Sequence, residues 1–435
     1  MKRIALVVAL LWCASGVASG GGFGIPEIGF RETAMGAVLG RPDDGTAIYH
    51  NPAGLALVPG WQILLSTGLA LPNTELRLAP WPESDRFLGA TPEADGYYAP
   101  VKPSRAFAVI PMLAITGEIL PHRLYAGLAL YVGNATGAQF DQGSVARYHL
   151  IDGYIIAPQL MAAASYQLRD DLAIGAALGV VNMRVHGHRL VYPILQDTDV
   201  SSIIGTRADL QLDGEAWAPA WSIGAFGRPH PRITWGATIV GRIDATLEGP
   251  VVIAYSDDSQ APGDTLEGRQ KTSLLLPWTF EAGVAVDVSP NIEIGVEGRY
   301  WLYHQYKRQH SDIVGIFLLR ELDTPKNYAD SWQVSGGVRV HDLAALPRVE
   351  LMTGAKYDKS PAPANTITLD QPVFTHFGIH AGVRYAFDRY RIGASYTHYW
   401  YDVPTITDSL TIPPTNLQGH GDNHILTLSL EAKLR

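Results

Sequence analysis

Beyond residue 60, apolar side chains recur at every second position in segments of about ten residues. A period of two is the repeat of a β-strand whose two faces meet different surroundings, whereas an amphipathic helix repeats every 3.6 residues. The alternation is clearest in segments 171–181 and 426–434. Together with less regular segments near 105–116, 123–132, 154–168 and 214–227, the pattern predicts fourteen strands.

The connections between these segments are of two kinds, and the two kinds alternate. Short turns are expected at 117–122, 169–171, 228–231, 289–291, 342–347 and 388–389. Long polar loops are expected at 71–104, 133–147, 186–208, 249–271, 309–330, 358–373 and 402–422. Short turns at one end and long loops at the other are typical of bacterial outer-membrane barrels. We therefore predict an all-β fold, a 14-stranded antiparallel transmembrane β-barrel formed by residues 61–435.

A soluble β-sandwich or propeller is the alternative to a membrane barrel. The sequence has no repeat of the length of a propeller blade, and the apolar faces have no second sheet to pack against. Both observations favour the barrel.

The N-terminal segment, residues 21–60, follows neither a strand nor a long-helix pattern. Glycines and prolines punctuate it at Gly36, Gly40, Gly45, Gly54, Pro26, Pro42 and Pro52. It also carries about ten large apolar side chains, too much apolar surface for a free tail. We therefore expect a compact irregular hatch that plugs the lumen of the barrel.

Residues 1–20 have the order of a secretory signal peptide. Lys2 and Arg3 precede the apolar run 4–11, and small residues follow up to an expected cleavage site near Ser19 or Gly20. The only cysteine, Cys13, lies within this signal, and the bulky Trp12 before it argues against a lipoprotein. The mature chain is therefore expected to contain no thiol and no disulfide.

Composition supports an exported membrane protein. The 435-residue chain is 47% hydrophobic and only 17% charged, yet past residue 20 no apolar run approaches the ~20 residues of a membrane helix. Its net charge of −9 and the absence of a basic cluster argue against a nucleic-acid partner. We expect the outer membrane of a Gram-negative bacterium, with membrane lipid and lipopolysaccharide as surroundings and the monomer as the functional unit.

Charged residues on the polar faces of the strands indicate what the lumen contains. A mixture of both signs fits either a water-filled pore or a network that holds an internal plug. The N-terminal segment has charges of its own, Glu27, Arg31, Glu32, Asp43 and Asp44. The charges expected to face inward are Glu281, Asp287, Glu293, Glu297, Arg299, Arg339, Arg384, His376 and His380.

Aromatic residues gather near the ends of the predicted strands. Tyrosine and tryptophan favour the two membrane–water interfaces, so we expect these residues to form girdles. They include Trp61, Trp235, Trp278, Tyr300, Trp301, Trp332, Tyr399, Trp400 and Tyr401.

The mature N-terminus resembles the FadL-type outer-membrane transporters of long-chain fatty acids and other hydrophobic compounds (OmpP1/FadL/TodX). The resemblance rests on Gly22-Phe23-Gly24, Ala34-Met35-Gly36, Asp43-Asp44 and, above all, Asn51-Pro52-Ala53-Gly54-Leu55-Ala56. The strand and loop pattern extends it over the mature chain. One departure is the end of the chain, Leu434-Arg435, where barrels of this class usually have an aromatic residue.

The resemblance implies a barrel closed by an N-terminal hatch and passive uptake of a fatty acid or another hydrophobic compound, with lateral exit into the membrane. Carried over residue by residue, the ligand and hatch residues are Phe23, Ile25, Asn51, Pro52 and Ala53. The kink of the third strand, where the wall opens, falls at Gly133, Asn134 and Gly137, just after 124–132. The same glycines also fit a plain loop.

Two other functions are alternatives to transport of hydrophobic compounds. An outer-membrane lipid hydrolase needs a nucleophile, and no serine, histidine or aspartate of the chain lies in a known nucleophile motif. The pair His186 and His188 is a weak candidate for a metal site, because loop histidines are usually solvated. A general porin for polar solutes fits the inward charges but needs no apolar plug. We therefore expect no catalytic residue, no metal and no cofactor.

Overall fold

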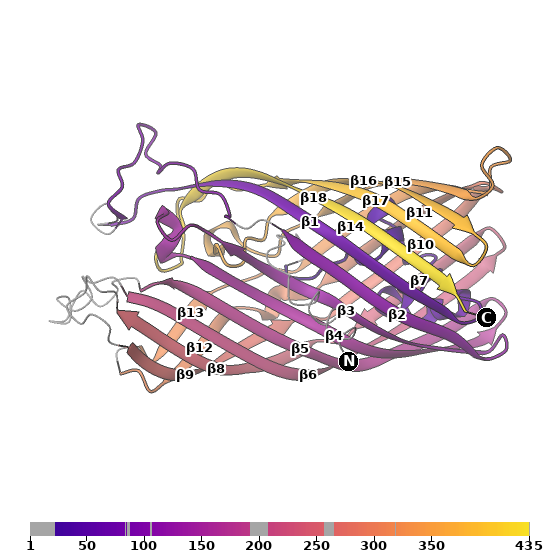
Figure 1. The fold of residues 1–435 in the computed structure, drawn as a ribbon, viewed down its shortest axis with the longest axis horizontal. Coiled ribbons are helices and arrows are strands. Elements are labelled where there is room, and N and C mark those ends of the chain that lie inside the picture. The colour runs from indigo at the N-terminus through magenta and orange to yellow at the C-terminus, as the bar shows by residue number, and fades with distance from the viewer. Residues whose placement is uncertain are drawn as a thin grey trace.

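The computed structural model describes residues 22–82, 84, 88–104, 107–191, 208–255, 265–317 and 319–434, and these build one closed antiparallel β-barrel (Figure 1). The predicted signal peptide and Cys13 lie outside the described residues. The short turns lie at one end of the barrel and the long connections at the other (Figure 1).

Eighteen strand segments form a single sheet. The pairs β7 and β8, β9 and β10, β11 and β12, and β13 and β14 are each two halves of one interrupted strand, so the wall has the predicted fourteen strands. The segments are β1 (Gln62–Leu78), β2 (Ala108–Leu120), β3 (Leu124–Gln139), β4 (Asp152–Arg169), β5 (Leu172–Leu190), β6 (Ala208–His230), β7 (Ile233–Val240), β8 (Ile243–Tyr255), β9 (Thr265–Leu276), β10 (Thr279–Ser289), β11 (Ile292–Trp301), β12 (Arg308–Val314), β13 (Glu321–Pro325), β14 (Ser331–Val340), β15 (Val349–Asp358), β16 (Thr375–Phe387), β17 (Tyr390–Asp402) and β18 (Leu417–Lys433).

The sheet closes because β1 pairs with β18 along its whole length, from Gln62 opposite Lys433 to Leu78 opposite Leu417. Closure leaves no unpaired sheet edge, which a lipid environment cannot satisfy with hydrogen bonds. Short 3-10 turns interrupt the connections, η2 (Val145–Tyr148), η3 (Tyr303–Gln305) and η4 (Ala364–Thr366).

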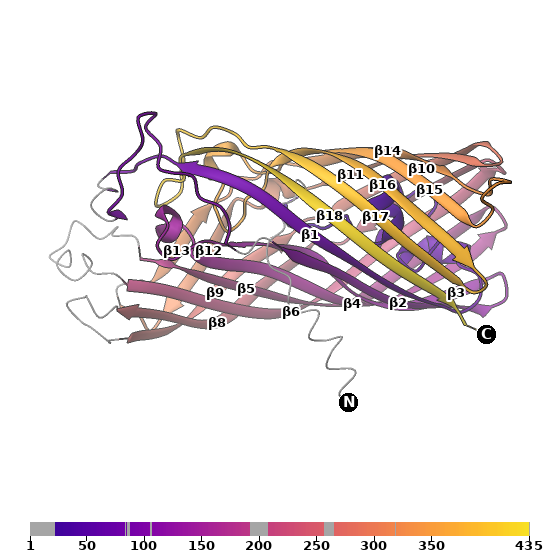
Figure 2. The same ribbon diagram turned by 45° about the horizontal axis from the view of Figure 1, so that its top comes forward.

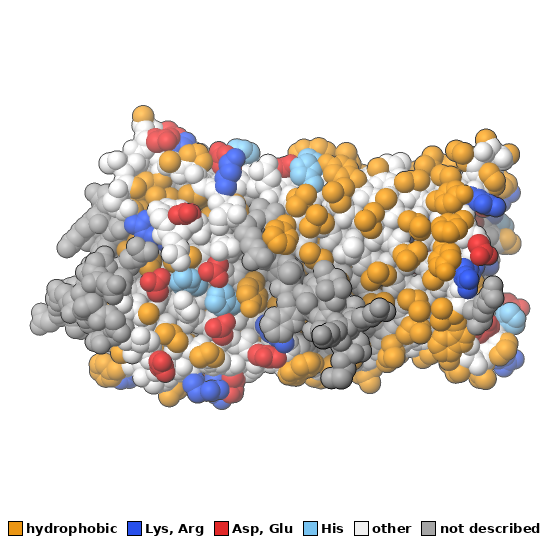
Figure 3. All heavy atoms as spheres, viewed as in Figure 1, with side chains coloured by type: hydrophobic (Ala, Val, Ile, Leu, Met, Phe, Trp, Pro, Cys, Tyr) orange, Lys and Arg blue, Asp and Glu red, His pale blue; other side chains and the backbone are white. Residues whose placement is uncertain are grey.

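The outer face of the barrel is apolar over a broad band. Leu178 of β5 is 65% exposed and Leu428 of β18 is 62% exposed, while their strand neighbours Ala177, Thr427 and Ser429 are buried. Apolar side chains cover the half of the surface nearer the short turns, whereas charged groups gather toward the long loops (Figure 3). No helix in the described part of the chain has the length and apolar character needed to span a bilayer.

Two details differ from the sequence prediction. Several strands continue well into the expected loops, such as β1 to Leu78 and β5 to Leu190, because polar residues near their outer ends hide the alternation. The expected girdle is also incomplete. Trp61, Tyr300, Trp332 and Trp400 are exposed, but Trp301, Tyr399 and Tyr401 are buried on the inner face, since neighbouring residues of a strand point to opposite sides.

The N-terminal segment folds into three short helices inside the barrel (Figure 2). These are α2 (Phe30–Met35), α3 (Ala47–His50) and η1 (Pro52–Leu57). Gly36 ends α2 in the left-handed region at φ 67°, which a glycine adopts without steric cost. The Asn51 side chain accepts from the Ala53 amide and Pro52 occupies the first turn, so this motif starts η1.

Candidate functional site

Ion pairs fasten the N-terminal segment to the inner wall. Arg41 pairs with Asp287 and Glu293 at 2.8 Å each, and Arg31 also pairs with Glu293. Glu297 accepts hydrogen bonds from the backbone amides of Val38 and Leu39 at 2.6 and 2.8 Å. Of the two interpretations of the inward charges, this arrangement favours the network that holds an internal plug.

A second group of charges lies around Glu32 of α2. Its carboxylate accepts from Arg299 of β11 at 3.1 and 3.2 Å and from Lys356 of β15 at 2.7 Å. Lys356 also contacts Glu27 at 3.2 Å. Burial by itself raises the pKa of Glu32, but Arg299 and Lys356 outweigh it and hold the pKa well below its ordinary value. Glu32 is therefore an anion with two buried cationic partners.

His50 of α3 is the neutral member of this group. Burial, followed by the neighbouring Arg299 guanidinium, lowers the pKa of the imidazole to about 4. Its Nε2 atom lies 2.8 Å from the Ile28 carbonyl oxygen, and its Nδ1 atom lies 3.3 Å from Arg299.

The predicted residues Asn51, Pro52 and Ala53 anchor the far end of the segment. Asn51 donates to the Ala225 carbonyl of β6 at 2.9 Å, and the Ala53 carbonyl accepts from Ser165 of β4 at 2.9 Å. These residues are buried against β4, β5 and β6 and do not line the pocket described below.

The predicted residues at the other end of the segment meet the predicted kink. The pairing of β3 with β4 shifts between Val132 and Asn134, which makes Gly133 a β-bulge. The Ile25 amide donates to the Gly133 carbonyl at 2.9 Å, and the Ala135 amide donates to the Phe23 carbonyl at 2.9 Å. Gly24 of the N-terminal segment thus forms a short antiparallel bridge with Asn134 of β3, beside the bulge.

The side chain of Phe23 fixes this end. It is fully buried and packs edge-on against Tyr303 at 6.0 Å and Tyr306 at 5.9 Å between ring centroids. Gly137, the last residue of the predicted kink, pairs regularly with Tyr154 and lies beyond the bulge.

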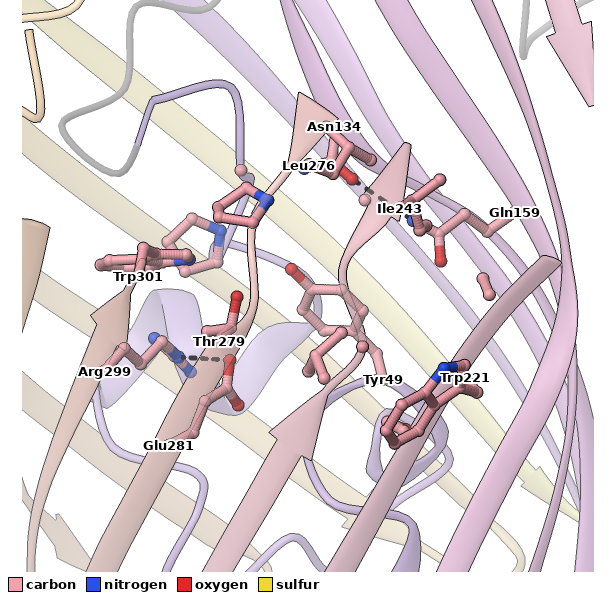
Figure 4. Close-up of a pocket in the computed structure, with 18 of the residues that line it drawn as sticks. Tyr49, Asn134, Gln159, Trp221, Ile243, Leu276, Thr279, Glu281, Arg299 and Trp301 are labelled. Atoms are coloured by element: carbon pink, nitrogen blue, oxygen red, sulfur yellow. Dashed lines mark hydrogen bonds and ion pairs between the residues drawn. The ribbon is translucent and has the colours of Figure 1, made fainter. Parts of the chain in front are cut away.

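A pocket lies between this bridge and the opposite wall (Figure 4). Gly24, Pro26 and Tyr49 of the N-terminal segment line one side. The wall contributes Gly133 and Asn134 at the β3 bulge, and residues at the breaks of the interrupted strands, including Gly241, Pro277 and Trp301. Of the predicted site residues, only Gly133 and Asn134 line this pocket directly, while Phe23 and Ile25 flank the lining residue Gly24.

Three polar side chains lie where the pocket meets the bulge. Tyr131 donates to Gln159 at 3.2 Å, and Gln159 donates to Asn134 at 3.3 Å. The rest of the lining is largely aromatic and aliphatic, with Tyr49, Trp221, Ile243, Leu276 and Trp301 visible in Figure 4. A mostly apolar pocket with a few polar groups is the usual form of a small-molecule site.

Sequence reasoning missed the wall side of this pocket. Pro277 and Gly241 interrupt otherwise strand-like segments, and such residues mark a break or a close approach of the backbone. That signal was present in the sequence, but only the folded barrel shows that several breaks fall beside one cavity.

Comparisons with known proteins agree with this architecture. Residues 11–435 match the family model described as outer membrane protein transport protein (OMPP1/FadL/TodX). The chain belongs to this family. The assignment confirms the predicted transport class, as opposed to an enzyme, and the predicted location in the outer membrane of Gram-negative bacteria.

Solved structures of the OMPP1/FadL/TodX family share the fold at low sequence identity. A FadL homologue from Pseudomonas aeruginosa is 15% identical, with a TM-score of 0.74 over 95% of this chain and 100% of that one. The toluene transporter TodX of Pseudomonas putida is 16% identical, with a TM-score of 0.74 over 96% of this chain and 100% of that one. The Ralstonia pickettii toluene transporter TbuX is 14% identical, with a TM-score of 0.65 over 96% of this chain and 99% of that one. A search of curated proteins finds no match to this chain.

Proposed function

We propose that this OMPP1/FadL/TodX protein carries a hydrophobic compound passively across the outer membrane, through a barrel gated by the hatch and with lateral exit at the β3 bulge. In this proposal residues 21–60 are the hatch and residues 61–435 the transmembrane barrel. The compound enters from the long-loop end, occupies the pocket and leaves sideways into the membrane.

The observation that carries the proposal is the bridge between the N-terminus and β3. Two backbone hydrogen bonds, from Ile25 to Gly133 and from Ala135 to Phe23, close the pocket beside the β-bulge of β3. Two such bonds contribute about 1–3 kcal/mol in total. A compound that is buried more deeply when the bridge is released gains about 0.8 kcal/mol for each additional buried methylene, so about four of them offset the two hydrogen bonds.

Lateral exit follows from the cost of exposing the same compound to water. A ten-carbon chain that leaves an apolar pocket for water loses about 8 kcal/mol, whereas a chain that passes into the bilayer keeps that stabilisation. Gly133 belongs to the wall and also lines the pocket, so in this proposal the compound leaves at its bulge.

A disulfide between Gly24 and Asn134 tests this gate. The two residues face each other in a narrow antiparallel bridge, and opposed residues of this kind have Cα atoms about 4.5 Å apart, within the range of a disulfide. Cys13 lies in the predicted signal peptide, so the double variant Gly24→Cys, Asn134→Cys has a clean background.

We expect uptake of radiolabelled toluene or 1-decanol by cells expressing the oxidised double variant to fall to the level of the empty vector, and reductant to restore it. Each single variant, under the same oxidant, is the matched control. Uptake through the oxidised variant at the rate of the reduced one would show that the bridge is not the gate.

An open porin is the remaining alternative, and the charged network around the hatch disfavours it. In planar bilayers we expect a small conductance, since the N-terminal segment occupies the lumen. A large steady conductance from the unmodified protein would support the porin.

A further inference from the structure

We infer that the pocket selects uncharged ligands and rejects carboxylates, with Glu281 of β10 as the residue that determines this choice. The inference rests on the proposed uptake function and adds the chemical class of the compound. It concerns the charges that surround the pocket, not the shape of the pocket.

Only two of the described residues lining the pocket are charged, Glu281 and Arg299. Their side chains lie side by side on one wall of the cavity (Figure 4), and Nε of Arg299 is 3.6 Å from the Glu281 carboxylate. The ligand therefore meets one acidic group and one basic group.

Arg299 is not available to a ligand carboxylate. Its guanidinium contacts Glu32 at 3.1 Å, Glu297 at 2.9 Å and Glu281 at 3.6 Å, and its side chain is only 2% exposed. A carboxylate bound to Arg299 would displace one of three protein carboxylates that already hold it. The chain thus offers an incoming anion no free positive partner among the described lining residues.

The charges behind Arg299 add to this effect. Lys356 is the only other cation of the group, and Glu27 and Glu32 engage it. Four acidic side chains, Glu27, Glu32, Glu281 and Glu297, face two cations, so acidic groups outnumber basic groups beside the pocket. An anion in the neighbouring pocket is repelled, and the low local polarity strengthens the repulsion.

The remaining lining residues suit an uncharged molecule. Aromatic rings of Tyr49, Tyr131, Trp221, Trp301 and Tyr303 supply apolar contact area and ring faces. The amides of Asn134 and Gln159 and the hydroxyl of Thr279 can pair with one neutral polar group. Neutral aromatic or aliphatic hydrocarbons and their alcohols meet these conditions, whereas a fatty-acid anion does not.

The test compares two probes of equal chain length, 1-decanol and decanoate, at pH 8, where decanoate is ionised. Uptake of each radiolabelled probe is measured in cells that lack other transporters of this family, with the empty vector subtracted. We expect decanol uptake to exceed decanoate uptake about tenfold or more, the scale of one like-charge contact in a partly polar site.

The variant Glu281→Gln keeps the size of the side chain and removes its charge. We expect it to raise decanoate uptake severalfold and to leave decanol uptake within twofold. Glu248→Gln is the matched control, because Glu248 pairs with Lys271 on the exposed loop-end part of the barrel and is remote from the pocket. Unchanged decanol uptake also shows that the variant is folded and inserted.

The outcomes separate the two proposals. If neither probe enters faster than with the empty vector, the proposed uptake function fails. If decanoate enters as fast as decanol through the unmodified protein, uptake stands and the selection of uncharged ligands is wrong. If decanol is preferred but Glu281→Gln changes nothing, Glu281 is not the determinant.

A separate observation concerns the outer face of the barrel, where we propose a site for a divalent transition metal ion such as Zn²⁺. The site consists of His398 of β17 and Asp422 and His424 of β18, whose ligand atoms all lie within 4.8 Å of one another. Oδ2 of Asp422 is 3.0 Å from Nε2 of His424 and 3.7 Å from Nε2 of His398. Ligands around one tetrahedral zinc ion are about 3.3 Å apart, given bonds of about 2.0–2.1 Å.

Neighbouring side chains orient these three groups toward a common point where a metal ion could bind. Nε2 of His398 is enclosed and has no hydrogen-bond partner among the described residues. Asn73 of β1 donates to the other oxygen of Asp422 at 2.9 Å, which leaves Oδ2 directed at the histidines. The Tyr396 hydroxyl lies 2.7 Å from Nδ1 of His424 and 3.2 Å from Nδ1 of His398, so it orients both rings, as outer partners of metal ligands do.

Absorption of bound Co²⁺, a spectroscopic substitute for Zn²⁺, tests this site in the purified protein. We expect ligand-field bands that Zn²⁺ removes and that His398→Gln and His424→Gln abolish. His420→Gln is the matched control, because His420 is on the same strand and outside the cluster. The proposal is wrong if the unmodified protein shows no such bands. It is also wrong if the bands persist in the variant that combines His398→Gln and His424→Gln.

Discussion

Gly175 of β5 lies directly against Ala53 of the N-terminal segment: a Cβ atom at position 175 would be 2.4 Å from the Ala53 amide nitrogen. No side chain tolerates that separation, so the contact requires glycine. The end of the segment near Asn51-Pro52-Ala53 is therefore fitted to the backbone of the wall, while the other end is held by the bridge to β3.

Gly175→Ala is expected to displace η1 from the wall. We predict that a protease cleaves the N-terminal segment faster and that the conductance in planar bilayers is higher. The barrel itself should still form. Gly187→Ala on the same strand is the control, because its nearest neighbour would be an ordinary 3.5 Å away. Equal behaviour of the two variants would refute the close fit.

Lys356→Met is expected to destabilise the segment from the other side. The substitution leaves Glu27 and Glu32 buried with fewer cationic partners, and loss of one member of a buried ion pair costs about 3–5 kcal/mol. Hydrogen exchange of residues 22–50 should become faster. Lys271→Met, which breaks an exposed pair with Glu248, should cost about 1 kcal/mol or less and leave that exchange unchanged.

Acid is predicted to loosen the N-terminal segment. The pKa of Glu32 is lowered in the folded state, so its stabilisation is complete above the ordinary value of 4.5 and is lost as the pH falls below it. His50 acts in the same direction, because its pKa falls from 6.5 to about 4 and release of the segment allows it to bind a proton. Conductance should rise as the pH falls from 7 toward 4. The variant His50→Gln should lack the part of this increase that occurs between pH 6.5 and pH 4.5. A flat conductance over this range would contradict the prediction.

His186 and His188, the weak candidates for a metal site in the sequence, belong to a hydrogen-bonded chain at the loop end of the barrel. His186 bridges Asp213 at 2.7 Å and Asp152 at 2.9 Å, and His188 bridges Asp152 and Asp209 at 3.0 Å each. Each ring nitrogen faces a carboxylate and donates to it only when it carries a proton, so the chain favours both rings in the charged form.

Asp152→Asn is therefore predicted to loosen the outer ends of β4, β5 and β6. The substitution weakens a carboxylate contact with each histidine, and we expect faster hydrogen exchange over 184–190, equivalent to about 0.5–2 kcal/mol. Asp141→Asn in the neighbouring loop is the control. Equal exchange in the two variants would mean that the chain contributes little to stability.

The barrel could be predicted from the sequence because its physics is local. In segment 171–181, successive side chains point alternately to the lipid and to the interior of the barrel. Each face therefore determines the residue type at every second position. The inward charges were recognised in the same way, and Glu293 and Arg299 do hold the N-terminal segment.

The pocket could not be predicted in the same way, because it depends on distant segments. Glu281 and Asn134 are both pocket residues, yet nothing near either of them in the sequence indicates the other. The motif Asn51-Pro52-Ala53, the strongest signal of the resemblance, turned out to anchor the segment instead of lining the cavity. Ligand roles for Phe23, Ile25 and the residues of that motif stay predictions.

The seam between β1 and β18 has a consequence for biogenesis. These two strands are the first and the last of the wall, so the cylinder stays open until the end of the polypeptide has been exported. The N-terminal segment precedes β1 and reaches the membrane before the closing strand. Pairing of the last strand with the first therefore encloses the N-terminal segment inside the finished wall.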